Sequence, residues 1–354
     1  MEHRSARAVT TVLRTLVFGL LFCTAAAARA AASDELDPAE LEAKTRALAQ
    51  ASAAVVGVRV TAVDNARSAA TLGRQRRGSG VVIDHEGLVL TIGYLILEAD
   101  HVDLVFGDQR TMPARVIAYD LASGFGLLRP LVPVQVEPAR LGNSTGVSRD
   151  MPLMIASGGR DGDLSLAHMV DQRAFSGYWE YHIDGALFTA PARADHSGAS
   201  LFNADGELLG IGSLIVTDAA GPGQPRLAGN MFVPIDLLKP ILAELRERGA
   251  SRNSTRAWMG LNCVEEAVSQ DGRVRVVRVT PDSPAEAAGL RVGDRIVRID
   301  DTQVHGLASF YKALWSNDAP EREVHLEILR GDATQAVTVL TQDRMKTLSK
   351  PQGI

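Results

Sequence analysis

Short hydrophobic segments separated by turn residues dominate the chain from about residue 53 to residue 245. Runs such as 55–60 (VVGVRV), 79–83 (SGVVI) and 102–106 (VDLVF) have the length and β-branched content of strands. Glycine, proline and aspartate lie in the gaps between such runs. Many short strands at this spacing predict an all-β sandwich or barrel for this part of the chain.

A helix start precedes this strand-rich region. Asp37 is a good N-cap residue, Pro38 suits the first helical position, and Glu40 lies three residues after the cap. The sequence therefore predicts an N-terminal helical arm over residues 33–51. Its alanine-rich, mostly polar surface offers little to bury, so we expect a packed or fraying arm.

A smaller unit with mixed helix and strand patterning occupies residues 255–345. Strand-like apolar runs flank a helical stretch at residues 307–315. The polar, Gly- and Ser-containing residues 246–254 predict a short flexible linker, which would let the two units move relative to each other. Residues 346–354 are expected to form a disordered tail.

The first 32 residues have the layout of a secretory signal peptide. A basic start precedes an apolar stretch at residues 16–23 and an alanine-rich segment that satisfies the small-x-small cleavage rule. The apolar stretch is too short for a comfortable membrane span. After cleavage only Cys263 remains, so no intramolecular disulfide is expected. These features predict a periplasmic protein.

Composition narrows the kinds of ligand. The net charge of −5 is spread without large runs, so no basic stripe for nucleic acid is present. The sequence predicts no metal site and no cofactor.

Three segments carry the candidate chemistry: residues 90–96 (LTIGYLI), 119–128 (YDLASGFGLL) and 195–201 (DHSGASL). With residues 77–84 (RGSGVVID) and 231–242 (MFVPIDLLKPIL), they resemble in order the motifs of the HtrA/Deg family of periplasmic trypsin-like serine proteases. For residues 52–245 the resemblance implies two antiparallel six-stranded barrels with a cleft between them.

Laid on the family pattern, the nucleophilic serine falls at Ser197, the histidine at Tyr94 and the aspartate at Gly124. A serine hydroxyl needs a base to remove its proton, and a phenol with a reference pKa of about 10 is a poor proton acceptor at neutral pH. Gly124 has no side chain to orient a base. Asp195 replaces the glycine of the oxyanion position, where an acidic side chain opposes a developing negative charge.

Other histidines are candidate substitute bases. Each is expected to be an exposed or loop residue: His85, His101, His168, His182 and His196. His196 is adjacent to Ser197 but should project away from it.

Residues 283–296 (SPAEAAGLRVGDRI) resemble a specific motif of PDZ domains. PDZ domains add a C-terminal tail to a sheet edge and hold its carboxylate with loop N–H groups. The resemblance implies a carboxylate loop at Trp258, Met259, Gly260 and Leu261, and a β-branched residue at Gly260 is expected to weaken binding without unfolding the domain. Phe310 and Leu314 lie on the helix beside the groove and are equally consistent with core.

Three functions are compatible with these residues. The first is a pseudoprotease that binds polypeptides or C-terminal tails through the cleft and the PDZ groove, in protein quality control. The second is an active serine endopeptidase in which a non-standard base assists Ser197. The third is a structural or regulatory subunit of an active relative. HtrA relatives commonly trimerise through aromatic residues near the N-terminal arm, and this arm has none, so homo-oligomerisation is left open.

Overall fold

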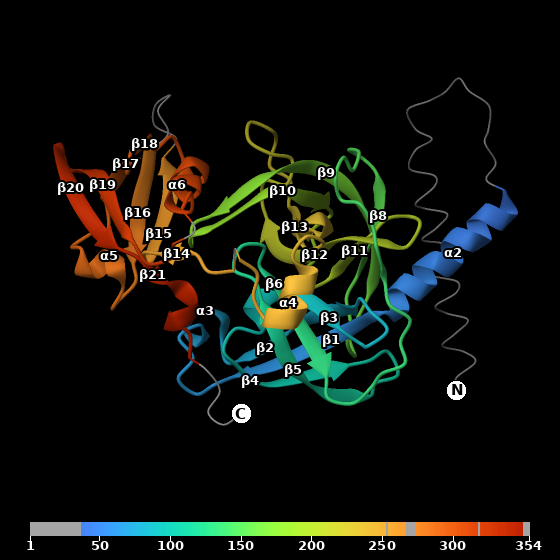
Figure 1. Cartoon of the computed structure of the whole chain (residues 1–354). Helices are drawn as coiled ribbons and strands as arrows, with labels where there is room; N and C mark the ends of the chain where they lie inside the picture. Colours follow the sequence, from blue (N-terminus) through green and yellow to red (C-terminus); the bar gives the residue numbers. More distant parts are fainter. Residues whose placement is uncertain (1–36, 253, 267–272, 318, 350–354) are drawn as a thin grey trace, which may run out of the picture.

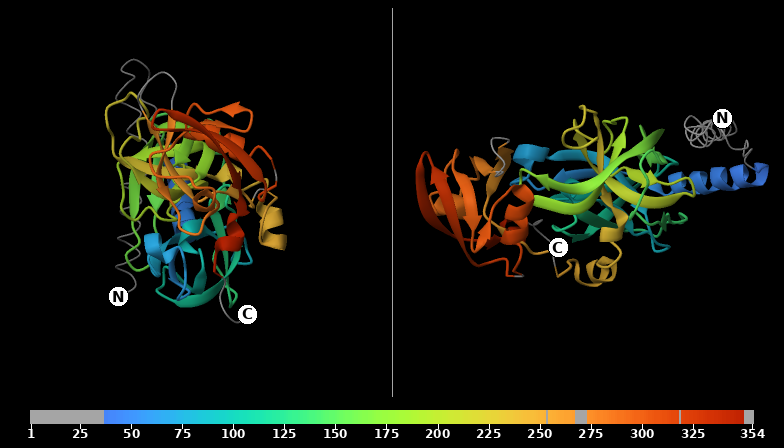
Figure 2. Two further views of the ribbon diagram at one scale, coloured as in Figure 1. Left: turned by 90° about the vertical axis from the view of Figure 1, so that its left-hand side faces the viewer. Right: turned by 90° about the horizontal axis from the view of Figure 1, so that it is seen from above.

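The computed structural model describes residues 37–252, 254–266, 273–317 and 319–349. The predicted signal peptide lies outside these residues. Within them, no helix is long and apolar enough to cross a membrane. A helix, two β-barrels and a small α+β domain follow one another along an elongated molecule, with helix α2 and the α+β domain at opposite ends (Figures 1 and 2).

Helix α2 (Pro38–Ala53) begins as its sequence predicts. The Asp37 side chain accepts a hydrogen bond from the Ala39 N–H at 3.0 Å, and Pro38 occupies the first turn. The helix continues two residues beyond the expected end at residue 51, to Ala53. Leu48 near its C-terminal end is fully buried, so this end of the arm is packed against the barrels.

The first barrel is closed by six antiparallel strands in the order β1-β2-β3-β6-β5-β4. Every residue of β3 and most of β1 and β2 are buried, because both faces of these valine-rich strands meet apolar side chains. The strands are β1 (Val55–Ala62), β2 (Gln75–Val82), β3 (Val89–Ile92), β4 (Ala99–Val105), β5 (Thr111–Tyr119) and β6 (Phe125–Pro130).

The second barrel closes because β11 pairs with both β8 and β12. The ring runs β11-β8-β9-β10-β13-β12, and the two-residue strand β7 (Arg140–Leu141) adds to β12 in parallel. Two six-stranded barrels are therefore confirmed. The ring strands are β8 (Pro152–Ala156), β9 (Leu164–Gly177), β10 (Tyr181–Ala190), β11 (Ser200–Phe202), β12 (Glu207–Val216) and β13 (Gly229–Pro234).

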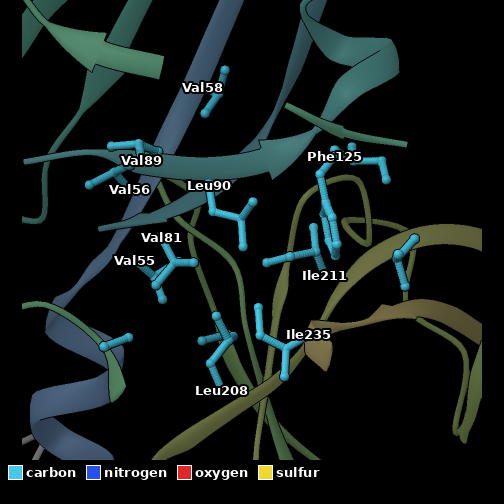
Figure 3. Close-up of a cluster of buried hydrophobic side chains, with 14 of the residues drawn as sticks. Val55, Val56, Val58, Val81, Val89, Leu90, Phe125, Leu208, Ile211 and Ile235 are labelled. Carbon is cyan, nitrogen blue, oxygen red and sulfur yellow. The ribbon is translucent and has the colours of Figure 1, made fainter. Parts of the chain in front are cut away.

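One hydrophobic core joins the two barrels. Leu90 and Phe125 of the first barrel belong to the same buried cluster as Leu208 and Ile211 of the second (Figure 3). Burial of such side chains contributes about 1.5 to 3 kcal/mol each. The loops that meet at the barrel junction are consequently held by rigid walls.

The α+β domain has a separate core. Its sheet orders β15-β16-β17-β19-β20, with β18 beside β17, and β14 pairs with β21. Helix α6 (Leu307–Leu314) covers the sheet, and α5 (Pro284–Ala287) is capped by Ser283. The strands are β14 (Ala257–Trp258), β15 (Leu261–Glu266), β16 (Arg273–Val279), β17 (Arg295–Ile299), β18 (Thr302–Gln303), β19 (Glu323–Arg330), β20 (Ala333–Leu340) and β21 (Gln342–Asp343).

The connection between the barrels and the α+β domain is more ordered than the predicted flexible linker. Helix α4 (Leu242–Arg248) runs into the range expected to be linker. Ser251 and Ser254 are buried, and both hydroxyls donate to the Asp120 carboxylate, at 2.8 and 2.5 Å. Hydrogen bonds to a charged group contribute about 1.5 to 3 kcal/mol each, so Asp120 ties the connection to the first barrel.

The described part of the tail is also attached. The short helix η3 (Arg344–Thr347) follows β21, and the Ser349 N–H donates to the Glu98 carboxylate at 2.7 Å. This part of the range expected to be disordered therefore has a defined position, and residues 350–354 lie outside the described residues.

Candidate functional site

Ser197 lies in the turn between β10 and β11, where two backbone hydrogen bonds hold it. The Ser79 N–H donates to the Ser197 carbonyl at 2.8 Å, and the Gly198 N–H donates to Gly212 O at 2.9 Å. Gly198 has φ +74°, and a Cβ there would lie 2.0 Å from Ser79 O, so only glycine fits. The turn is thus fixed against both barrels.

The Ser197 hydroxyl faces Tyr94, which lies in the short helix η1 (Gly93–Leu95) after β3. The Tyr94 hydroxyl oxygen is 2.7 Å from Ser197 Oγ and 2.9 Å from the Ser213 carbonyl oxygen. A phenol has one proton, and a carbonyl can only accept. Both contacts are satisfied together when the Tyr94 O–H donates to Ser213 and the Ser197 O–H donates to Tyr94.

This arrangement leaves Ser197 without a basic partner. Burial raises the pKa of Tyr94 to about 12, although its hydrogen bond with Ser197 acts in the opposite direction. The phenol is therefore neutral at physiological pH and a weaker proton acceptor than the imidazole of a triad. Residues 37–252 contain no histidine that forms a hydrogen bond with Ser197 Oγ.

Gly124 contacts the residue before Tyr94, because its carbonyl accepts a hydrogen bond from the Gly93 N–H at 2.7 Å. Its φ of +82° disfavours any side chain, and a Cβ there would lie 3.0 Å from the Tyr181 hydroxyl. That hydroxyl donates to Ser123 O at 2.8 Å. A buried phenol thus fills the space beside Gly124.

The Asp195 carboxylate is paired with Arg193 and Ser157. Arg193 donates to both carboxylate oxygens, with Nε at 2.9 Å and Nη2 at 2.5 Å, and Ser157 Oγ lies 2.5 Å away. Burial alone would raise the pKa of Asp195, but the hydrogen bonds from Arg193 and Ser157 outweigh it and lower the pKa below its usual value. The backbone of Asp195 does not adopt a positive φ. This turn therefore carries a fixed carboxylate.

A cleft of about 280 Å³ opens beside Ser197, between the two barrels. Arg59 and Arg77 face each other across β1 and β2 on one wall, while the loop containing Arg160 and Asp161 forms another. Backbone atoms of several glycines complete it. The cleft is partly open, and polar and apolar surface line it in about equal shares, which suits an extended polypeptide better than a small apolar ligand.

The other histidines differ in their surroundings. His85, His101 and His168 are exposed as expected, and His196 Nδ1 faces the carbonyls of Arg193 and Ala194 at 3.3 and 3.1 Å. The expectation for His182 is wrong, because it is only 6 % exposed.

His182 lies between Ser176 Oγ, at 2.8 Å, and Asp184 Oδ1, at 3.4 Å. These residues stand on the β9–β10 hairpin outside the cleft, and Lys312 also contacts Asp184. Within this cluster His182 is buried, whereas the Asp184–Lys312 ion pair that joins the hairpin to α6 is exposed.

The loop before β15 already holds a carboxylate. The N–H groups of Gly260 and Leu261 each donate to Glu180 Oε1 at 3.0 Å, and the Met259 N–H lies 3.3 Å from both oxygens. Trp258 instead pairs with Gln342 in β21. The three amides of residues 259–261 therefore converge on one anion, which comes from the β9–β10 turn.

Two expectations for this region need correction or refinement. Phe310 and Leu314 are fully buried in the domain core, and the neighbouring Tyr311 makes the hydrogen bonds to the hairpin. Gly260 has φ +85°, and a Cβ there would lie 2.3 Å from Ser283 Cβ. A β-branched substitution would strain the domain itself, contrary to the expectation that it would leave the fold intact.

Sequence reasoning missed Glu180, Tyr181 and Tyr311. The available signal was the aromatic and acidic cluster at residues 178–181 (YWEY), which is unusual for a simple hairpin turn. Nothing in the spacing of this cluster indicates that Glu180 binds the amide groups of residues 259–261 in another domain.

Comparison with known proteins shows what the chain is similar to. Residues 78–211 match the trypsin-like peptidase domain, and residues 259–341 match the PDZ domain. The putative serine protease HhoA of Synechocystis is 28% identical over 297 residues, which are 76% of this chain and 72% of the relative. The probable periplasmic serine endoprotease DegP-like of Hahella chejuensis is 24% identical, over 76% of this chain and 57% of the relative.

The chain has the domain content of the HtrA/Deg-type proteases that it resembles, a trypsin-like peptidase domain followed by a PDZ domain. Solved structures agree in fold. The HtrA-type protease AlgW with tripeptide superimposes with a TM-score of 0.54 at 19% identity, covering 85% of this chain and 97% of that one. The serine endoprotease from Yersinia pestis gives a TM-score of 0.52 at 20% identity, with the same coverage. The match at residues 259–341 identifies the α+β domain as a PDZ domain.

Proposed function

We propose that this HtrA/Deg-like protein binds polypeptides without hydrolysing them, as a pseudoprotease of protein quality control. The observation that carries the proposal is the 2.7 Å contact between Ser197 Oγ and the Tyr94 hydroxyl. Acyl transfer needs a group that accepts the serine proton and later returns it to the leaving amine. A neutral phenol whose proton is directed to the Ser213 carbonyl does neither at physiological pH.

The oxyanion position supports the same proposal. Tetrahedral intermediates are stabilised by preorganised donors aimed at the developing charge. Asp195 adds a carboxylate at that turn, and Arg193 and Ser157 keep it ionised. The partners of the protein would be unfolded segments in the open cleft and free C-terminal tails at the amides of residues 259–261.

A cleavage assay tests this proposal. The purified protein should degrade reduced, unfolded casein no faster than its Ser197→Ala variant, across pH 6 to 9. An active family protease in the same buffer serves as the positive control. Turnover that depends on Ser197 would contradict the proposal and favour an endopeptidase with a non-standard base.

We also propose a periplasmic location. Its support is the signal-peptide layout of the first 32 residues and the periplasmic designation of the Hahella relative. N-terminal sequencing of protein from a periplasmic extract should find a start near Ala31 or Ser33. An intact Met1 start in the cytoplasm would overturn the location.

A further inference from the structure

The β9–β10 hairpin enters the PDZ domain as a ligand would. Figures 1 and 2 show this hairpin extending from the second barrel to α6 and β15. The Cys263 N–H of β15 donates to the Tyr178 carbonyl at 2.9 Å, so the hairpin tip lies along the free edge of the PDZ sheet. Backbone pairing at this edge is how PDZ domains receive a peptide strand.

The Glu180 side chain stands where a terminal carboxylate would. It follows Tyr178 by two residues and receives the amides of residues 259–261 at 3.0 to 3.3 Å. Glu180 is only 5 % exposed and has φ +57°, a conformation that costs a non-glycine residue about 1 kcal/mol or more. A turn distorted in this way persists because its surroundings favour it.

Tyr311 of α6 anchors the same turn. Its hydroxyl donates to Gly177 O at 2.8 Å and accepts from the Glu180 N–H at 3.2 Å. The phenol therefore uses its one proton and its acceptor capacity on the two sides of the tip. Trp179 stacks on Tyr181 at 5.9 Å and meets Tyr178 edge to face at 4.8 Å, which makes the tip rigid.

We infer that the β9–β10 hairpin is an internal ligand of the PDZ groove, and that an external C-terminal peptide binds only by displacing Glu180 from the amides of residues 259–261. The inference rests on the proposed function of this groove. A site occupied by an internal competitor shows an apparent affinity equal to its intrinsic affinity multiplied by the fraction of molecules in which the groove is open. Because the hairpin belongs to the protease-like domain, binding of a tail also removes this contact between the two domains.

Peptide binding by the full chain tests the inference. The probe is a fluorescein-labelled decapeptide with a free C-terminal valine, measured by anisotropy, with its C-terminally amidated form as the control peptide. Glu180→Ala should bind the free peptide at least about tenfold more tightly than the unmodified protein, because the open fraction rises. Tyr311→Phe keeps the buried ring but loses the anchor to Gly177, and should bind several-fold more tightly.

Asp184→Asn is the matched control. Asp184 lies on the same hairpin, is 70 % exposed in its side chain and contacts Lys312 at 3.1 Å, so its loss removes charge without freeing the amide loop. Its affinity should stay within about twofold, since exposed ion pairs contribute little. Thermal unfolding of each variant verifies that the fold is retained.

The outcomes separate the two proposals. The unmodified protein, Glu180→Ala and Tyr311→Phe could bind the free peptide equally tightly and the amidated peptide more weakly. That result would overturn the proposal of an internal competitor but keep the proposal that the groove binds C-termini. Absence of peptide binding in every variant would overturn both.

Discussion

At the scale of single residues, the site differs from a serine protease in more than the identity of two side chains. Tyr94 places a high-pKa hydroxyl against Ser197, and Gly124 adopts a backbone conformation that side chains avoid. Tyr181 occupies the space next to Gly124. The surroundings of the two positions therefore fit the residues that are present.

Restoring the triad by substitution should consequently fail. A Tyr94→His/Gly124→Asp double variant should not cleave casein above a triple variant that also carries Ser197→Ala. The new aspartate would need a positive φ, which costs about 1 to 2 kcal/mol, and would meet the Tyr181 hydroxyl 3.0 Å from its Cβ.

Cleavage by the double variant that is lost in the triple variant would show that the site is only two side chains from activity. Adding Tyr181→Phe removes the obstructing hydroxyl and identifies its share of the block.

Local motifs carried most of the site prediction at this scale. Ser197, Tyr94 and Gly124 were located from the sequence because each lies inside a contiguous segment whose neighbours set the strand and turn around it. Glu180 could not be found in this way, since its nearest amide partner in sequence, Met259, lies 79 residues away in another domain. Gly260 was placed in the correct loop, but its contact with Ser283 depends on tertiary packing.

At the scale of elements, the β9–β10 hairpin is the most informative one. It pairs within the second barrel and its tip lies against β15 and α6. Short β-branched runs separated by turn residues predicted the barrels, because strand and turn preferences are local properties of the sequence. The domain that a hairpin tip contacts cannot be predicted from local sequence, because any exposed aromatic turn has the same pattern.

Docking of this hairpin should depend on pH through Glu180. Burial raises its pKa to about 7, although the amides of Leu261, Met259 and Gly260 and the charge of Arg344 oppose the shift. A released hairpin would expose the carboxyl to water and return its pKa to about 4.3. Tyr311 of α6 and Cys263 of β15 also face this group, and burial raises both of their pKa values, so they stay neutral.

The direction of the pH dependence of docking follows from this difference in the pKa of Glu180. The docked state binds the proton more tightly, so docking is most stable below about pH 4.3 and weakens as pH rises through about 7. The free-carboxylate peptide should therefore bind the unmodified protein more tightly at pH 8 than at pH 5.5, relative to Glu180→Gln measured with the same peptide. A ratio between the two proteins that is constant over this range would exclude Glu180 as the titrating group.

At the scale of the whole molecule, the two barrels share one hydrophobic core, and the PDZ domain is attached to them at several points. Asp120 binds Ser251 and Ser254 of the connection, Ser349 reaches Glu98, and Glu180 reaches the amide loop. The sequence predicted freely moving domains, since the connection is short, polar and contains glycine. Buried hydrogen bonds to carboxylates from distant segments outweigh that local composition.

This organisation suits a protein in which polypeptide binding at one domain changes the contact between the two domains. The cleft beside Ser197 and the amide loop lie on different bodies, and the hairpin belongs to one while occupying the other. Occupation of the groove by a tail would change the attachment of the PDZ domain without any hydrolysis.

Labelling of Ser197 tests the central claim, an unactivated serine, most directly. The intact protein is incubated with a serine-directed diphenyl phosphonate at pH 8 and its mass is measured, with an active trypsin-like protease as the positive control. The neutral Tyr94 phenol accepts a hydrogen bond from Ser197 but does not remove its proton at this pH. We therefore predict no added mass under conditions that label the control completely. Stoichiometric addition that disappears in Ser197→Ala would contradict the account.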